Sequence, residues 1–190
     1  MKEDEYRRRG LEPHEKKSMS KKTFSILVIM FLTAFILSLI FEIRIFIFLT
    51  LTALTGVINY NINLLTFRVD PGLEVFLSLV LTRTYGLGYG LVLIFAGEII
   101  PDLLTARLDK DTTLSIIFTL LINFVAVQYP DVNFVLLGLI LVTIKFIICL
   151  GLDIIFMFAP EEMIFETGLN FVVNIILLLA FGDIFIALLG

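Results

Sequence analysis

The sequence has little of the side-chain chemistry on which most enzymes depend. It contains one cysteine, Cys149, one histidine, His14, and no tryptophan. A single thiol cannot form a disulfide within the chain, and one histidine with one cysteine cannot supply a zinc site or a catalytic triad. No phosphate-binding P-loop, HExxH or GxSxG motif is present. We therefore expect no enzymatic activity, no catalytic residues, no bound metal and no cofactor.

Charged residues are also scarce. They make up 17% of the chain, whereas 59% of the residues are hydrophobic and nineteen are phenylalanine. A soluble domain has roughly 25% charged and 45 to 50% apolar residues. A chain of 190 residues has too little interior to bury this much apolar surface. The composition predicts an integral membrane protein.

The few charges are unevenly distributed. Residues 1–22 contain eight of the fourteen Lys and Arg residues and five of the eighteen acids. Positive charge before the first apolar segment indicates a cytoplasmic N-terminus, and that segment is of full membrane-span length with no small-residue cleavage site after it, unlike a secretory signal. We expect a solvated, disordered cytoplasmic tail over 1–22, which orients the protein or contacts anionic lipid or a partner, and one transmembrane helical domain over 23–190.

Polar residues divide that domain into apolar segments, which we compare with the roughly 20 residues that a helix needs to cross a bilayer. If the chain crosses the membrane an even number of times between the N-terminal tail and the loop with Arg107 and Lys110, that loop lies on the same, cytoplasmic side as the tail. The predicted fold is an all-α, polytopic transmembrane bundle of six to seven helices in the cell membrane, the short third helix being either a crossing or re-entrant. The predicted helices cover residues 23–41, 45–60, 73–82, 86–104, 113–129, 133–158 and 163–190.

A lysine lies at the centre of one of the most apolar stretches, LVTIKFIICLGLD, residues 141–153. A charged lysine at mid-bilayer costs about 2.5 to 3.5 kcal/mol on insertion scales, so Lys145 needs a partner. In one interpretation, Lys145 forms a structural ion pair with Glu98 or Asp153. In the other, Lys145 faces a cavity and binds the carboxylate or phosphate of a ligand.

The depth of Lys145 can be estimated by counting about 1.5 Å per residue from the cytoplasmic helix ends. This count places Lys145 level with about residue 176 on the last helix, near Asn174, and with residues 125–127 on the fifth, between Asn123 and Gln128. Glu98 then lies about 10 Å nearer the cytoplasm. Amides therefore lie at the level of Lys145, and acids do not.

Two further polar groupings interrupt apolar helices. Glu98 and Asp102 are four residues apart, and Pro101 between them removes a helical hydrogen bond, so that a carbonyl is left for a ligand or a polar neighbour. Asp102 could instead pair with Arg107 at the interface. On the last helix, Glu166, Asn170 and Asn174 recur every four residues, a stripe that suits either helix packing or ligand binding. The candidate solute-binding residues are Lys145, Glu98, Asn174, Asn170, Asp153 and Asn123.

Small residues recur at positions that suit close helix contacts. Gly86, Gly90 and Gly97 fall on nearly one face of the predicted fourth helix, and Ala34 and Ser38 lie four apart on the first. Such faces pack against a neighbouring helix of the same chain or dock a separate membrane protein. The candidate partner-docking residues are Ala34, Ser38, Gly86 and Gly90.

One stretch resembles a transporter family. The string DPGLEVFLSLVLTRTYGLGYGLVLIFAGEIIPDLL, residues 70–104, resembles the second and third helices of the substrate-binding S-components of energy-coupling-factor transporters. Those helices have an early acidic residue, an aromatic-glycine turn, here Tyr85 and Gly86, and then spaced glycines. TGLNFVVNIILLLAFGDIF, residues 167–185, is similar to their asparagine-bearing last helix. The glycine-then-aspartate pattern is also similar to the rod-shape-determining membrane protein family, whose members act as scaffolds.

The S-component resemblance implies a six-helix core, here residues 45–190, with an additional helix before it. It also implies a small-molecule pocket near the outer face, and docking onto a transmembrane coupling subunit driven by ATPases. We therefore predict a membrane protein that binds a small, anionic solute as a transporter substrate-binding subunit, with the lipid bilayer, the solute and a coupling subunit as partners and no nucleic acid. A non-catalytic scaffold and an ion or proton pathway remain as alternatives.

Overall fold

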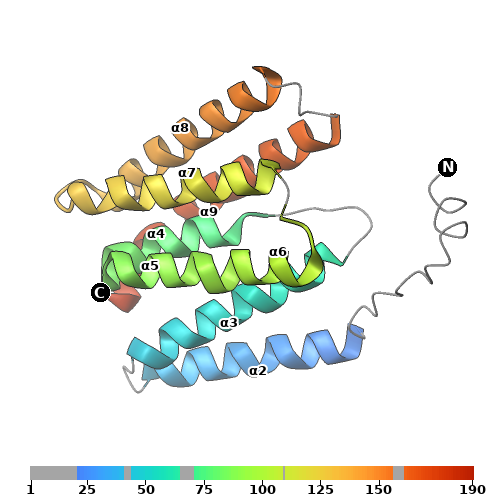
Figure 1. Ribbon diagram of the computed structural model, residues 1–190. Coiled ribbons are helices and arrows are strands. Elements are labelled where there is room, and N and C mark those ends of the chain that lie inside the picture. The colour runs from blue at the N-terminus through green and yellow to red at the C-terminus, as the bar shows by residue number, and fades with distance from the viewer. Residues whose placement is uncertain (1–20, 41–43, 65–70, 109, 156–160) are drawn as a thin grey trace, which may run out of the picture.

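The computed structural model describes residues 21–40, 44–64, 71–108, 110–155 and 161–190, and these residues form helices without strands. Three consecutive elements, α5, η1 and α6, make one continuous helix, so the described residues form seven helices in all, which confirms the predicted all-α bundle (Figure 1). The elements are α2 (Lys21–Ile40), α3 (Arg44–Asn63), α4 (Leu73–Tyr85), α5 (Leu87–Ile94), η1 (Phe95–Ile99), α6 (Ile100–Thr105), α7 (Lys110–Gln128), α8 (Phe134–Ile155) and α9 (Glu161–Leu189).

The helix ends follow from local sequence signals. Gly72 and Gly86 have φ angles of 63° and 100°, which glycine adopts without steric cost, and they bound α4 on either side. Gly86 is the single residue between α4 and α5, so these two helices form a tight antiparallel hairpin. At the start of α8, Asn133 Oδ1 accepts the Leu136 N–H at 3.0 Å, a typical N-cap.

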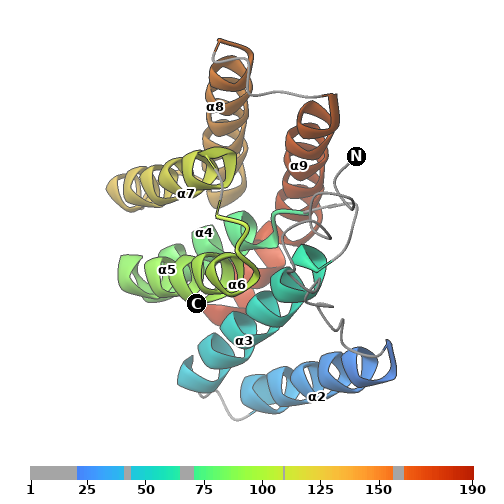
Figure 2. The ribbon, with the colours of Figure 1, turned by 45° about the vertical axis from the view of Figure 1, so that its right-hand side comes forward.

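The short helix α4 lies at the centre of the bundle. Nine consecutive residues, Glu74–Thr82, are buried, so α4 has no face toward the surroundings along this stretch. It packs against α3, α5, α7 and α9, and both ribbon views show it between them (Figures 1 and 2). At its C-terminal end, Arg83 donates to the carbonyls of Tyr129 and Val132, and so holds the α7–α8 turn against α4.

Helix α2 lies at the edge of the bundle, packed along α3 (Figure 1). Most of its exposed side chains are apolar, among them Ile26, Ile29 and Met30, and Ser25 and Thr33 are exposed too. The side chains of Ala34 and Ser38 lie outside the described residues, and the proposed docking role of this pair stays a prediction.

Four helices of the described chain are long and apolar enough to cross a membrane: Arg44–Asn63, Leu87–Thr105, Phe134–Leu152 and Thr167–Leu189. The shorter apolar helix Thr112–Gln128 accompanies them. Large apolar side chains point outward along these helices, where lipid would cover them. These features give the chain the character of a membrane protein, as the composition predicts.

Three predicted helix bounds differ from the structure by three residues each: α3 ends at Asn63 rather than 60, α4 ends at Tyr85 rather than 82, and α7 begins at Lys110 rather than 113. The predicted end of α8 at 158 lies outside the described residues, which reach Ile155 in this helix. Lys145 Nζ donates to Thr119 on α7. The predicted level of Lys145 on α7, residues 125–127, is therefore wrong, and Thr119 lies there instead.

Candidate functional site

Four helices contact one another in a closed ring. Helix α4 packs against α7, α7 against α8, α8 against α9, and α9 against α4. Figure 2 shows this arrangement, with α7 and α8 on one side of α4 and α9 on the other. Each member of the ring contributes polar side chains. Seven of these form the candidate site: Ser78 and Thr82 from α4, Thr119 and Asn123 from α7, Lys145 from α8, and Asn170 and Asn174 from α9.

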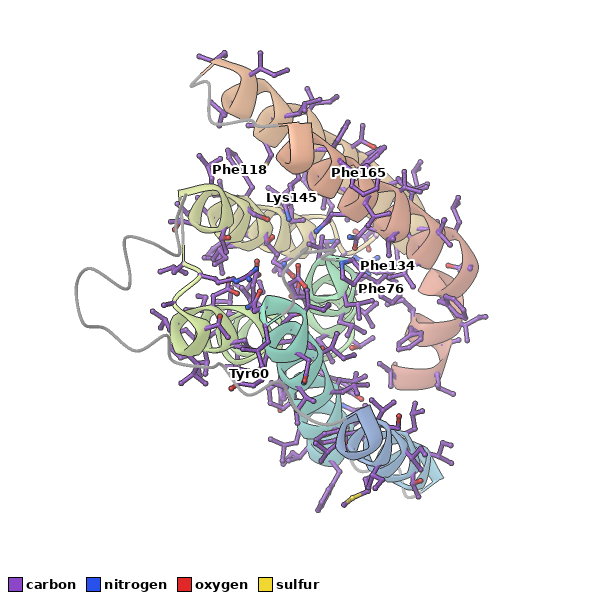
Figure 3. All side chains as sticks on the ribbon, turned by 90° about the vertical axis from the view of Figure 1, so that its right-hand side faces the viewer. Tyr60, Phe76, Phe118, Phe134, Lys145 and Phe165 are labelled. Atoms are coloured by element: carbon purple, nitrogen blue, oxygen red, sulfur yellow. The ribbon has the colours of Figure 1, made fainter. Side chains whose placement is uncertain are left out.

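Lys145 is the cationic member of this set. It lies beside α7 in Figure 3, is 7% exposed, and donates from Nζ to Thr119 Oγ1 at 2.9 Å. Thr119 Oγ1 in turn donates to the Ser115 carbonyl at 2.8 Å. Within the described part of the chain, Lys145 forms no ion pair, and its other two N–H donors have no partner. The predicted ion pair with Glu98 is therefore wrong.

Glu98 lies elsewhere in the bundle. It is buried in η1, and η1 packs against α3, α5 and α6 rather than against a helix of the ring. The side chain of Asp153, the other acid predicted to pair with Lys145, lies outside the described residues, as does that of Glu166.

Asn123 joins two helices of the ring. Its Nδ2 donates to Ser78 Oγ at 2.9 Å and to the Thr119 carbonyl at 2.8 Å, and its Oδ1 accepts from Thr82 Oγ1 at 2.7 Å. Asn123, fully buried, thus uses all its donors and one acceptor site within the chain. It fixes α7 against α4 and holds the backbone of Thr119, the partner of Lys145.

Gly90 makes this contact between helices possible. A Cβ added at Gly90 would overlap Thr82 Oγ1 and lie 2.9 Å from the Ser78 carbonyl and 3.2 Å from Asn123 Oδ1. Gly90 therefore faces α4 and α7 within the chain and is not available to a separate protein, which corrects its predicted docking role. Gly86 lies in the α4–α5 turn rather than on the predicted helix face, is exposed, and has no atom within 4 Å of an added Cβ, so its docking role stays a prediction.

Asn174 joins α9 to the start of α4. Its Nδ2 lies 3.1 Å from the Gly72 carbonyl, 2.9 Å from the Asn170 carbonyl and 3.0 Å from Asn170 Oδ1. The Asn170 side chain packs so closely on Gly72 that a Cβ there would overlap it. The predicted polar stripe on the last helix thus meets the N-terminal end of the central helix.

A second polar interface lies outside the ring, between α3 and the continuous helix α5–η1–α6. Pro101 has no N–H, and its ring crowds the carbonyl of Gly97, four residues earlier. The helix widens there into the π-helical turn η1. The Gly97 carbonyl accepts a hydrogen bond from Asn59 Nδ2 at 2.9 Å. The carbonyl that Pro101 was predicted to leave without a helical partner is therefore satisfied by a side chain of the same protein.

The same face of α3 makes further contacts to buried acids. Asn59 Nδ2 lies 3.4 Å from Glu74 Oε2, and Asn63 donates to the Asp102 carboxylate. The Asp102 backbone carbonyl accepts the Arg107 N–H at 2.8 Å. Sequence reasoning missed Asn59 and Asn63, although Thr55, Asn59 and Asn63 recur every four residues in an otherwise apolar segment.

The described residues contain no group of three or more His, Cys, Asp or Glu side chains that could hold a metal ion. The site therefore consists of one buried ammonium group with amides and hydroxyls around it. Such groups bind and orient a ligand through hydrogen bonds and charge.

Comparisons with known proteins do not assign the chain to a family. No family model, no curated protein and no solved structure matches it. The resemblances noted in the sequence stay predictions, and the function has to be argued from the site.

Proposed function

We propose that the chain binds a small, anionic solute between α4, α7, α8 and α9, as the substrate-binding subunit of a membrane transport system. The observation that supports this most directly is the bonding of Lys145. Its ammonium group is buried, has one hydrogen bond, to a neutral hydroxyl group, and forms no ion pair among the described residues.

The energetics of that environment favour an anionic ligand. A lysine at the centre of a membrane helix costs about 2.5 to 3.5 kcal/mol, and a hydrogen bond that involves a charged group contributes about 1.5 to 3 kcal/mol. If the middle of each range is taken, the hydrogen bond to Thr119 offsets only part of the free-energy cost of placing the lysine in the membrane. Two ammonium donors remain for the oxygens of a carboxylate or phosphate, which is the group that would complete the site.

The surrounding network fits a positioning role. Asn123 uses its amide to hold Thr119 and α4 together, so the hydroxyl beside Lys145 lies on a fixed backbone. Lys145 and Asn174 are both buried when the ring is closed, so a solute reaches them when the four helices move apart. An opening of this kind is what a transport subunit requires in order to load and release its solute.

The source of energy would be another chain. The sequence contains no P-loop, so an ATP-driven step requires a partner with ATPase subunits, such as the coupling subunit that the S-component resemblance implies.

The protein would lie in the cell membrane with its N-terminus in the cytoplasm. Single cysteines replacing Ser18 or Asp109, in a Cys149→Ser background, should then be shielded from an impermeant thiol reagent in intact cells. Labelling of either position from outside contradicts this orientation.

The test of solute binding is the substitution Lys145→Met, which removes the charge and keeps the apolar stem. Affinity for an anionic solute should fall by about tenfold to a hundredfold, since a charge-assisted hydrogen bond contributes about 1.5 to 3 kcal/mol. Without solute, the melting temperature should stay the same or rise, because Thr119 still donates to Ser115. Thr143→Val is the matched control on the same helix, since the Thr143 hydroxyl donates only to the Leu139 carbonyl of its own helix and its loss should leave affinity unchanged.

A structural role for Lys145 would give the opposite result. If the lysine were half of a buried ion pair, Lys145→Met would leave a buried charge and lower stability by about 3 to 5 kcal/mol. A large fall in the melting temperature of solute-free Lys145→Met, reversed by Asp153→Asn or Glu98→Gln, would argue against solute binding.

A further inference from the structure

The side-chain amide of Asn174 has one unsatisfied end. Its three hydrogen-bond contacts, to the Gly72 carbonyl and to the carbonyl and Oδ1 of Asn170, all involve Nδ2. Asn174 Oδ1 is buried and has no hydrogen-bond partner among the described residues. Rotating the amide by 180° would place Oδ1 against two backbone carbonyls, so this orientation of the amide is the favourable one.

A buried acceptor without a donor is unusual. Most buried side-chain oxygens in proteins accept at least one hydrogen bond, because leaving one unsatisfied is unfavourable. Asn174 is fully buried, so lipid headgroups and bulk water do not reach its oxygen in the closed ring. A hydrogen-bond donor placed there by a ligand would satisfy it.

Asn174 and Lys145 lie at nearly the same depth on adjacent antiparallel helices. Phe146 stacks on Phe171 with ring centroids 4.3 Å apart, and the Leu178 side chain packs on Gly138. This register places Lys145 level with about residue 172, and Asn174 only about 3 Å farther along the bundle axis at 1.5 Å per residue. The two groups are thus close in depth on helices that pack against each other.

We infer that the solute is an acid which also bears a hydrogen-bond donor, such as a small hydroxy or amino carboxylic acid. This inference rests on the proposed function. The acid group binds the Lys145 ammonium, and the hydroxyl or ammonium group of the solute donates to Asn174 Oδ1. Lys145 alone would accept any small anion, and Asn174 provides the discrimination.

Two sets of matched acids test the inference on the purified full-length protein. Propionate, lactate and alanine differ only in bearing hydrogen, hydroxyl or ammonium at one carbon, and succinate, malate and aspartate differ in the same way. Dissociation constants from titration calorimetry should show that, in at least one set, a donor-bearing acid binds about tenfold more tightly than the plain acid. In Asn174→Leu, that ratio should fall to about twofold or less.

The outcomes separate this inference from the proposed function. If propionate or succinate binds as tightly as its hydroxy and amino counterparts in the unmodified protein, the donor requirement is wrong while solute binding stands. The wild-type comparison needs no variant, so a failure of Asn174→Leu to fold leaves it intact. If the ratio persists in a folded Asn174→Leu protein, the assignment to Asn174 is overturned. If none of the six acids binds, the inference is overturned, while the proposed function, which also admits a phosphate, is decided by whether Lys145→Met loses the anion that the unmodified protein retains through purification.

Discussion

Replacing Gly90 by alanine probes the helix contact on which the ring depends. The added Cβ would overlap Thr82 Oγ1 and come within 2.9 Å of the Ser78 carbonyl, a backbone atom that cannot move without shifting α4. Two consequences follow: the hydrogen bond from Thr82 to Asn123 is lost, and the interface between α4 and α5 is overpacked.

The magnitude can be worked from these contacts. Loss of one buried hydrogen bond costs about 1 kcal/mol and overpacking costs about 1 to 3 kcal/mol, while alanine regains up to about 1 kcal/mol in helix propensity over glycine. The net destabilisation should be about 2 kcal/mol, which lowers the melting temperature of a chain of this size by about 4 to 8 °C.

Gly88→Ala is the matched control. Gly88 lies in the same helix, and a Cβ added there meets no atom within 4 Å. Its melting temperature should equal or exceed that of the unmodified protein. Unfolding can be followed by circular dichroism at 222 nm or by the reaction of a thiol-reactive dye with Cys149, which is buried and is the only cysteine. Equal melting temperatures for Gly90→Ala and Gly88→Ala would refute the described contact between α4, α5 and α7.

Two further predictions use the same unfolding assay. Asn59→Leu should destabilise the protein by about 1 to 3 kcal/mol, because it deprives the Gly97 carbonyl of its side-chain donor. Asn61→Leu should cost less than about 1 kcal/mol, since the Asn61 amide bonds only to its own helix, and equal losses for the two variants would contradict the α3 interface. Gly72→Ala should be destabilising through its φ of 63° and the overlap with the Asn170 side chain. Asn170→Ala in the same protein should relieve part of that loss, and additive effects in the double-mutant cycle would refute the contact.

Much of the fold could be predicted from the sequence because helix boundaries in this chain coincide with polar or conformationally special residues. Gly72 precedes α4 as expected and Asn133 caps α8, whereas Gly86, which was predicted to begin the next helix, forms the turn before it. The errors arose where a helix continues through polar or charged residues, at the Asn63 end of α3, the Tyr85 end of α4 and the Lys110 start of α7. Hydrophobicity locates the part of a helix in the membrane, and it does not locate the helix end.

The candidate site was predicted in part. The level of Lys145 on the last helix was predicted at about residue 176, and the contacts of Phe146 with Phe171 and of Gly138 with Leu178 place it at about residue 172, so Asn174 lies between the two levels. The partner of Lys145 could not be predicted, since a threonine in an apolar helix such as Thr119 usually bonds to its own backbone, which Thr119 also does. The polar face of α3 was missed, although a period of four from Thr55 to Asn63 is visible in the sequence.

The most direct test of solute binding is mass spectrometry of small molecules that remain with the protein through purification. We predict that the unmodified protein retains an anionic solute, in an amount comparable with that of the protein itself, and that Lys145→Met prepared in parallel retains little or none. The same solute in equal amount on both proteins, or no anionic solute on the unmodified one, would contradict binding at Lys145.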